Sequence, residues 1–267
     1  MKILFLGDVV GLSGCRKITN DLSSQIQKNN IDFVIINGEN ADDTGVGLTK
    51  EICKNFFENG VDVITTGNHV WDQKDIMSFI DKEKRLLRPK NLFEPAPGRG
   101  FEIYKTKKNH RVGVLNLMGN VFMKKCEDVF KISREFLEKY VLKKDYDFLI
   151  VDFHGEITSE KNAIGHYFDG KATLVIGTHT HIPTNDARIL KNGTAYQTDA
   201  GMCGDYDSVI GMNKDNSINR FMKKNSTKHF PAIGEASLSG VIVNCNLETG
   251  LADSIESYIF GGLLKNT

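Results

Sequence analysis

Short apolar runs recur through the first two thirds of the chain, and each is followed by glycine or polar residues. Runs of this length, rich in Ile, Val, Leu and Phe, are typical of buried strands when turn residues bound them. They cover residues 3–6, 33–36, 61–64, 148–151 and 174–176. The chain is therefore predicted to build a sheet from strands that are separated by long connections.

The segments between these runs carry apolar residues at every third or fourth position, which predicts amphipathic helices. Thr49 and Asp72 are placed to cap two of them, and Gly60 is placed to end the first. A last short helix is expected to open at Ser159 and stop at Asp169. The apolar stripes are Ile18, Leu22 and Ile26; Ile52 and Phe56; Ile76 and Ile80; and Val129, Ile132, Phe136 and Tyr140. Strand–helix repetition implies crossover connections and a largely parallel sheet.

Hairpins are predicted in the rest of the chain. Residues 100–104 and 111–117 flank a polar, basic turn, and residues 187–190 and 194–198 flank a turn that contains Asn-Gly. Residues 240–246 form a further strand-like run. Since there is no internal repeat and no long linker, we expect a single α/β domain over residues 1–267 with more than one sheet.

Composition narrows the class of protein. The chain has 267 residues, of which 40% are hydrophobic and 25% charged, as in ordinary globular proteins. Lys plus Arg equals Asp plus Glu, 34 each, so no global field favours polymeric nucleic acid or an anionic membrane. No apolar run approaches the roughly 20 residues that span a bilayer. The five cysteines include no Cys-x-x-Cys pair. We therefore expect a cytoplasmic protein without a disulfide framework.

Residues able to bind a metal follow each of the apolar runs. They are Asp8; Glu39 and Asn40; Asn68 and His69; His154; and His179 and His181. In open α/β sheets, ligands gather beyond the carboxyl ends of the strands, so these residues are predicted to share one crevice.

Each of these residues has an ordinary alternative role when taken alone. Asp8 would more often cap the following helix, and a lone histidine is more often a hydrogen-bonded polar residue than a ligand. His179 and His181 lie two positions apart, so in an extended segment both face the same way. The remaining histidines, which we expect at the surface, are His110, His166 and His229.

In order, Gly7-Asp8, Gly38-Glu39-Asn40, Gly67-Asn68-His69, His154 and Gly177-Thr178-His179-Thr180-His181 resemble the motifs of the calcineurin-like metallophosphoesterase superfamily. The order is an Asp motif, a Gly-Asp motif, Gly-Asn-His, an isolated His and Gly-His-x-His. This resemblance extends from residue 8 to residue 181 and implies a four-layer α/β/β/α sandwich, with two mixed sheets flanked by helices.

Three departures from the superfamily pattern are informative. Val10 stands where a histidine is usual, Glu39 replaces the usual Asp, and the last motif is one residue longer. These departures resemble the YmdB-type branch, in which Asn40 would take the position of the missing histidine ligand. Residues 116–123 and 201–212 also resemble that branch, and residues 116–120 and 201–208 are candidates to line the substrate cleft.

The resemblance implies a site with two metal ions. Asp8, Glu39, Asn40 and His181 would bind one metal; Glu39, Asn68, His154 and His179 would bind the second. His69 would remain free as the catalytic acid. Mixed nitrogen and oxygen donors without thiolate suit iron, manganese or zinc better than calcium, and the branch implies iron.

The implied activity is phosphodiester hydrolysis, with cyclic nucleotides such as 2′,3′-cyclic AMP as substrates. A hydroxide between the metals would attack phosphorus, and His69 would protonate the departing oxygen. Self-association is compatible with the sequence, although no heptad pattern requires it.

Three alternatives stay open. The chain could be a regulatory metal-binding protein that acts through a partner, or a nuclease of the same superfamily. Zero net charge argues against the nuclease, because polymer binding normally needs a basic track. A cysteine nucleophile at Cys15 or Cys203 is least favoured, since neither has a neighbouring histidine.

Overall fold

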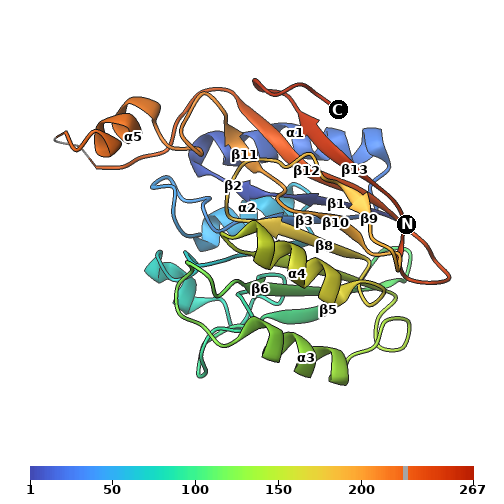
Figure 1. Ribbon diagram of the computed structural model, residues 1–267. Coiled ribbons are helices and arrows are strands. Elements are labelled where there is room, and N and C mark those ends of the chain that lie inside the picture. Colours follow the sequence, from blue (N-terminus) through green and yellow to red (C-terminus); the bar gives the residue numbers. More distant parts are fainter. Residues whose placement is uncertain (225–227) are drawn as a thin grey trace.

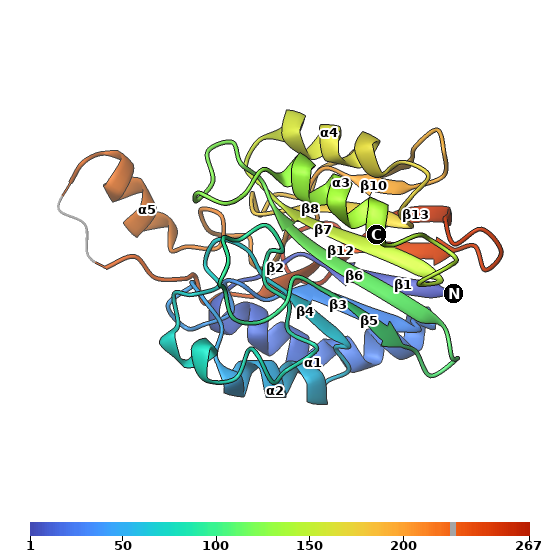
Figure 2. The same cartoon turned by 90° about the horizontal axis from the view of Figure 1, so that it is seen from below.

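Two mixed β-sheets lie face to face, and helices cover the outer face of each sheet (Figure 1 and Figure 2). The computed structural model describes residues 1–224 and 228–267. Figure 2 shows α1 and α2 on one side of the paired sheets and α3 and α4 on the other. The predicted four-layer α/β/β/α sandwich is thereby confirmed.

The first sheet has the strand order β2-β11-β12-β1-β3-β4, and β13 pairs with β12 outside this path. β1 is parallel to β3 and β3 to β4, whereas β12 is antiparallel to β1. The strands are β1 Lys2–Leu6, β2 Asp8–Val9, β3 Phe33–Asn37, β4 Val63–Thr65, β11 Met202–Asp205, β12 Ala236–Cys245 and β13 Ala252–Phe260.

The second sheet has the order β5-β6-β7-β8-β10-β9. β6, β7, β8 and β10 run parallel, and both predicted hairpins are present as the antiparallel pairs β5–β6 and β9–β10. The strands are β5 Phe101–Lys105, β6 Arg111–Met118, β7 Phe148–His154, β8 Leu174–Thr178, β9 Arg188–Ile189 and β10 Ala195–Gln197.

Most helices follow the predicted apolar stripes. Thr49 caps α2 by accepting a hydrogen bond from the Ile52 amide, as expected. α5 projects away from the body of the molecule in both ribbon views (Figure 1). The helices are α1 Gly11–Asn29, α2 Lys50–Glu58, α3 Val129–Lys139, α4 Thr158–Phe168, α5 Lys214–Phe221 and the 3₁₀ helix η1 Lys74–Ser78.

The prediction of an α-helix capped by Asp72 is wrong, both in the type of helix and in the capping residue. Only the short helix η1 forms there, and Gln73 precedes it without a side-chain cap. Asp72 instead pairs with His69, three residues earlier, and with Lys124. The carboxylate of Asp72 therefore forms ion pairs with side chains instead of capping a helix.

The core has three apolar layers that match the four layers of secondary structure. One layer lies between the sheets and includes Phe5, Phe33 and Phe148; the second packs α1 and α2 on the first sheet; the third packs α3 and α4 on the second sheet. Strands between two such layers are apolar on both faces, which explains the unbroken apolar runs in the sequence.

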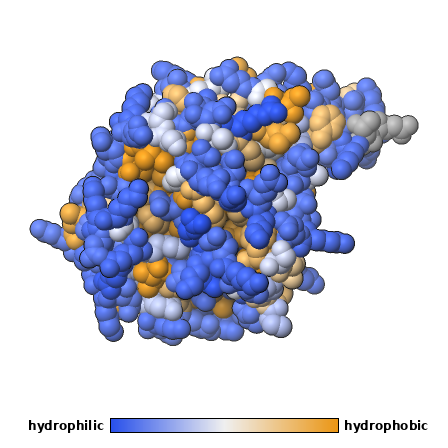
Figure 3. Space-filling model, turned by 180° about the vertical axis from the view of Figure 1, so that it is seen from behind, coloured by the Kyte–Doolittle hydropathy of each residue, from blue (hydrophilic) through white to orange (hydrophobic). Residues whose placement is uncertain are grey.

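Hydrophilic side chains predominate on the face in Figure 3, and apolar residues gather there in small patches. Across the described ranges, the helices are too short or too polar to cross a bilayer.

Replacing Phe5 by Ala should lower the free energy of unfolding by about 3–5 kcal/mol, because it leaves a cavity between the two sheets. Phe5 is fully buried, whereas Phe221 on α5 is 82% exposed. Phe221→Ala is therefore the matched control and should change stability by less than about 0.5 kcal/mol. Urea unfolding followed by circular dichroism measures both, and equal effects would contradict this account of the core.

Candidate metal centre

The predicted ligands meet at one edge of the sandwich, beyond the carboxyl ends of strands from both sheets. Asp8 opens β2; Glu39 and Asn40 follow β3; Asn68 follows β4. From the second sheet, His154 ends β7, while His179 and His181 follow β8. Parallel strands end at the same edge, so residues far apart in sequence converge there.

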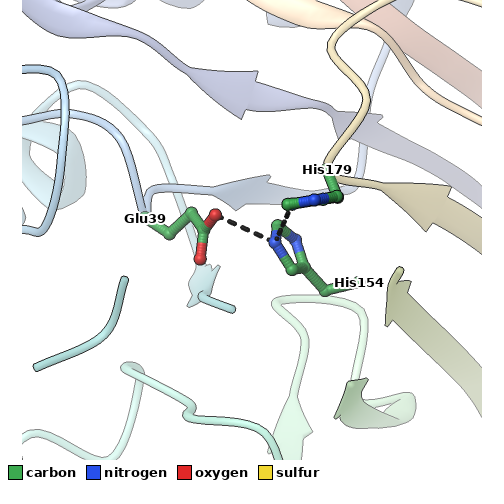
Figure 4. A group of neighbouring side chains, drawn as sticks. All are labelled: Glu39, His154 and His179. Carbon is green, nitrogen blue, oxygen red and sulfur yellow. Dashed lines mark hydrogen bonds and ion pairs between the residues drawn. The ribbon is translucent and has the colours of Figure 1, made fainter. Parts of the chain in front are cut away.

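His154 lies at the middle of the group and is fully buried. Its Nε2 lies 2.9 Å from Glu39 Oε1, 3.1 Å from Asn68 Oδ1 and 3.0 Å from His179 Nδ1. Figure 4 shows Glu39, His154 and His179 pointing toward one another from three different elements. Ligand atoms of these three residues all lie within 4.8 Å of one another, a spacing that suits a shared metal ion.

The other predicted ligands surround this group. Asp8 Oδ1 lies 3.7 Å from His154 Nδ1 and 3.9 Å from His181 Nε2. Asn40 forms a parallel β-bridge with Val10, close in sequence to Asp8. Asp8 does not cap α1, since Val10 holds the cap position and has no side-chain cap bond. All seven predicted ligands therefore gather at this edge.

Two buried oxygen atoms indicate that a cation fits this site. Asp8 Oδ1 and Asn40 Oδ1 have no hydrogen-bond partner within the part of the chain that the structure describes. A buried acceptor without a partner costs free energy, which a bound cation would recover. Carboxylate and amide oxygens with imidazole nitrogens, and without thiolate, suit iron, manganese or zinc. The residues present therefore fit a divalent metal centre.

The electrostatics of the site also favour a cation. Burial disfavours a charged imidazole, yet the carboxylates of Glu39, Asp8 and Asp152 raise the pKa of His154 to about 9. Burial would raise the pKa of Glu39, but His154 outweighs it and lowers this pKa to about 2. Burial and the nearby His154 lower the pKa of His179 to about 3. Negative charge is thus concentrated around His154, and His179 is a neutral imidazole able to ligate.

Gly67, just before Asn68, is required by close packing at the centre. A Cβ atom at this position would overlap His154 Cδ2 and Glu39 Oε2. The glycine of Gly-Asn-His therefore leaves the space in which these two proposed ligands meet.

A buried network that the sequence did not reveal orients His154. Its Nδ1 lies 3.0 Å from Thr178 Oγ1, and this hydroxyl donates to Asp152 Oδ1 at 2.7 Å. Because Thr178 uses its proton on Asp152, it can accept the Nδ1 proton of His154 and leave Nε2 facing the centre. Asp152 follows an apolar run directly, a signal that could have identified it.

A second network holds the loop that carries the last two histidines. His179 and His181 adopt φ of 98° and 66°, a left-handed conformation that is unfavourable for residues other than glycine. Asp199 accepts hydrogen bonds from the Thr180 amide at 3.2 Å and hydroxyl at 2.7 Å. Buried Lys161 pairs with the same oxygen at 2.6 Å. No sequence motif pointed to Lys161 or Asp199.

His69 lies at the edge of the centre and is partly exposed. Its amide donates to Glu39 Oε2 at 3.1 Å, and its Nδ1 lies 2.6 Å from Asp72 Oδ2. Lys124 Nζ bonds both the Asn68 carbonyl at 2.6 Å and Asp72 Oδ1 at 3.3 Å. Asp72 therefore fixes the ring of His69 through Nδ1, and Nε2 has no hydrogen-bond partner within the described ranges of the chain.

The thiol alternative is disfavoured. Burial raises the pKa of both Cys15 and Cys203 to about 12, so each thiol is protonated near neutral pH. Their sulfur atoms bond backbone carbonyls of Ala41 and Ser239. Neither group has the properties of an activated nucleophile.

Comparison with known proteins identifies the family of the chain. The model of the family described as YmdB-like protein matches residues 4–258. A protein of Bacillus subtilis strain 168 named 2′,3′-cyclic-nucleotide 2′-phosphodiesterase is 42% identical over 256 residues, which cover 96% of each chain.

Two solved structures share the whole fold. A hypothetical protein from Thermus thermophilus matches with a TM-score of 0.89 and 36% identity, covering 97% of this chain and 99% of the other. A phosphatase from Mycoplasma pneumoniae matches with a TM-score of 0.89 and 37% identity, covering 97% and 93%. The chain therefore belongs to the YmdB-like family of metallophosphoesterase-type proteins.

Proposed function

We propose that this protein hydrolyses phosphodiesters at a centre of two divalent metal ions, with cyclic nucleotides such as 2′,3′-cyclic AMP as substrates. The observation that carries this is the convergence of seven residues with oxygen or nitrogen donors, of which Asp8 Oδ1 and Asn40 Oδ1 are buried without a hydrogen-bond partner among the described residues. The similarity to the Bacillus subtilis phosphodiesterase supports the choice of substrate.

Glu39 would contact both metals, because its carboxylate has two oxygens and each can bind a cation. Asp8, Asn40 and His181 would complete one site; Asn68, His154 and His179 would complete the other. When bound, such a pair of ions neutralises a phosphodiester and makes water a better nucleophile at phosphorus. Iron is our preferred metal, with manganese and zinc as alternatives.

His69 would supply the proton that the departing oxygen needs. Asp72 accepts from the Nδ1–H of His69, and in the doubly protonated ring the Nε2–H is then available to donate. As the bond from hydroxide oxygen to phosphorus forms, the bond from phosphorus to one ribose oxygen breaks. That ribose oxygen takes the proton from His69 Nε2.

His69→Gln should lower kcat for 2′,3′-cyclic AMP by about 10²–10⁴-fold while metal content stays unchanged, because the proton donor is lost and the ligands remain. Elemental analysis and steady-state kinetics measure the two quantities. His166→Gln is the matched control, since His166 is exposed on α4. Wild-type turnover in His69→Gln would reject the role of His69.

Glu39→Gln should lose both metal and activity, because one neutral amide oxygen cannot replace a carboxylate shared by two cations. Glu58→Gln, on the surface of α2, should lose neither. Elemental analysis of both purified variants gives the metal content. Full metal content in Glu39→Gln would contradict the shared-ligand assignment.

Thr178→Val should weaken metal binding by about 10–100-fold, because it removes the hydroxyl that orients His154. Thr178→Ser keeps that hydroxyl and should stay close to wild type. Calorimetric titration of chelator-treated protein with Mn²⁺ measures the affinities without any assay of turnover. Equal affinities in the two variants would show that this hydroxyl does not position His154.

A further inference from the structure

A cavity of about 450 Å³ adjoins the candidate metal centre. Gly67 and Asn68 form part of its wall, so the proposed ligand Asn68 borders both the cavity and the candidate metal centre. Its remaining wall is mainly apolar and includes Trp71, Met77 and Phe93. The volume lies within the range of about 300–1,000 Å³ that is usual for small-molecule sites.

The apolar wall is unusually open to solvent. Phe93 is 57% exposed and Met77 is 55% exposed, whereas Trp71 is partly buried and packs on the core of the first sheet. Large apolar side chains that gather around a hollow, beside a polar centre, are typical of ligand sites. Pro95 and Pro97 in the same wall restrict its backbone.

The polar end of the cavity is linked to the proposed acid through Lys124 and Asp72. Lys124 lines the cavity, and its ammonium bonds both the Asn68 carbonyl and the Asp72 carboxylate. Asp72 in turn holds His69. A phosphate at the metal centre would therefore lie at the charged end, and the group attached to it would extend along the apolar wall.

We propose that this cavity binds the nucleobase of the substrate, with the base stacked on Trp71 or Phe93. The inference rests on the proposed function and extends it to the group that selects the substrate. A base has two flat apolar faces, and base–aromatic stacking tolerates any base because each has a π-face. The charged groups among the lining residues of the described chain are Lys124 and Lys125. We therefore expect a preference for nucleotides over base-free diesters, with little discrimination between bases.

The first test uses fluorescence. Trp71 is the single tryptophan of the chain, so tryptophan emission reports on this cavity directly. Adding 2′,3′-cyclic AMP should change the emission in a saturable manner, whereas the base-free glycerol 1,2-cyclic phosphate should leave it unchanged. The readout depends on binding and needs no turnover.

The second test compares two substrates in matched variants. In Phe93→Ala, the ratio of kcat/KM for 2′,3′-cyclic AMP to that for glycerol 1,2-cyclic phosphate should fall by about 10-fold, the loss expected for one stacking partner. Phe93→Tyr keeps a ring and should retain the wild-type ratio. Phe221→Ala removes an exposed ring outside the cavity and should also retain it.

The outcomes separate this inference from the proposed function. If wild-type protein hydrolyses both diesters, but Phe93→Ala keeps the wild-type ratio and Trp71 emission does not respond, the base site is wrong and the phosphodiesterase stands. If neither diester is hydrolysed with added Mn²⁺ or Fe²⁺, the proposed function is wrong. Trp71 emission that responds to cyclic AMP alone would still support a base-binding cavity.

Discussion

One buried carboxylate joins the two sheets directly beneath the candidate centre. Asp152 of β7 accepts hydrogen bonds from Asn37 of β3 and Thr65 of β4 in the first sheet, and from Thr178 of β8 in the second. Burial raises its pKa to about 6. Because such a group is stabilised only when its donors are in place, its position fixes the register of the two sheets against each other. His154 follows two residues later, so the same bonds place the central residue of the candidate metal centre.

Several features of the candidate centre cost the protein stability. Three features oppose stability when taken alone: the carboxylates gathered around His154, the buried oxygens of Asp8 and Asn40, and the left-handed backbone at His179 and His181. The two buried oxygens lack a hydrogen-bond partner among the described residues. The three features persist because the surrounding sheets and the buried Lys161–Asp199 pair hold them. A site that costs stability in this way is expected where the fold prepares donors for a cation.

Three different kinds of surface lie side by side along this edge of the sandwich. The proposed metal ligands lie at the strand ends, whereas His69 is partly exposed and pairs with Asp72. The apolar cavity beside Asn68 continues outward from the same point. Phosphate, leaving oxygen and base would thus each meet a different kind of surface within one continuous site.

The sequence by itself determined the strand runs and most helices, because buried parallel strands are apolar throughout. It also proposed eight site residues from their places after those strands, and the fold brings these residues to one edge. It failed at Asp72, whose carboxylate is a good helix cap by propensity but is engaged by His69 and Lys124. It also gave no sign of Asp199 or of the cavity around Trp71 and Phe93. These depend on segments that are distant in sequence and meet only when both sheets pack, so tertiary structure alone decided them.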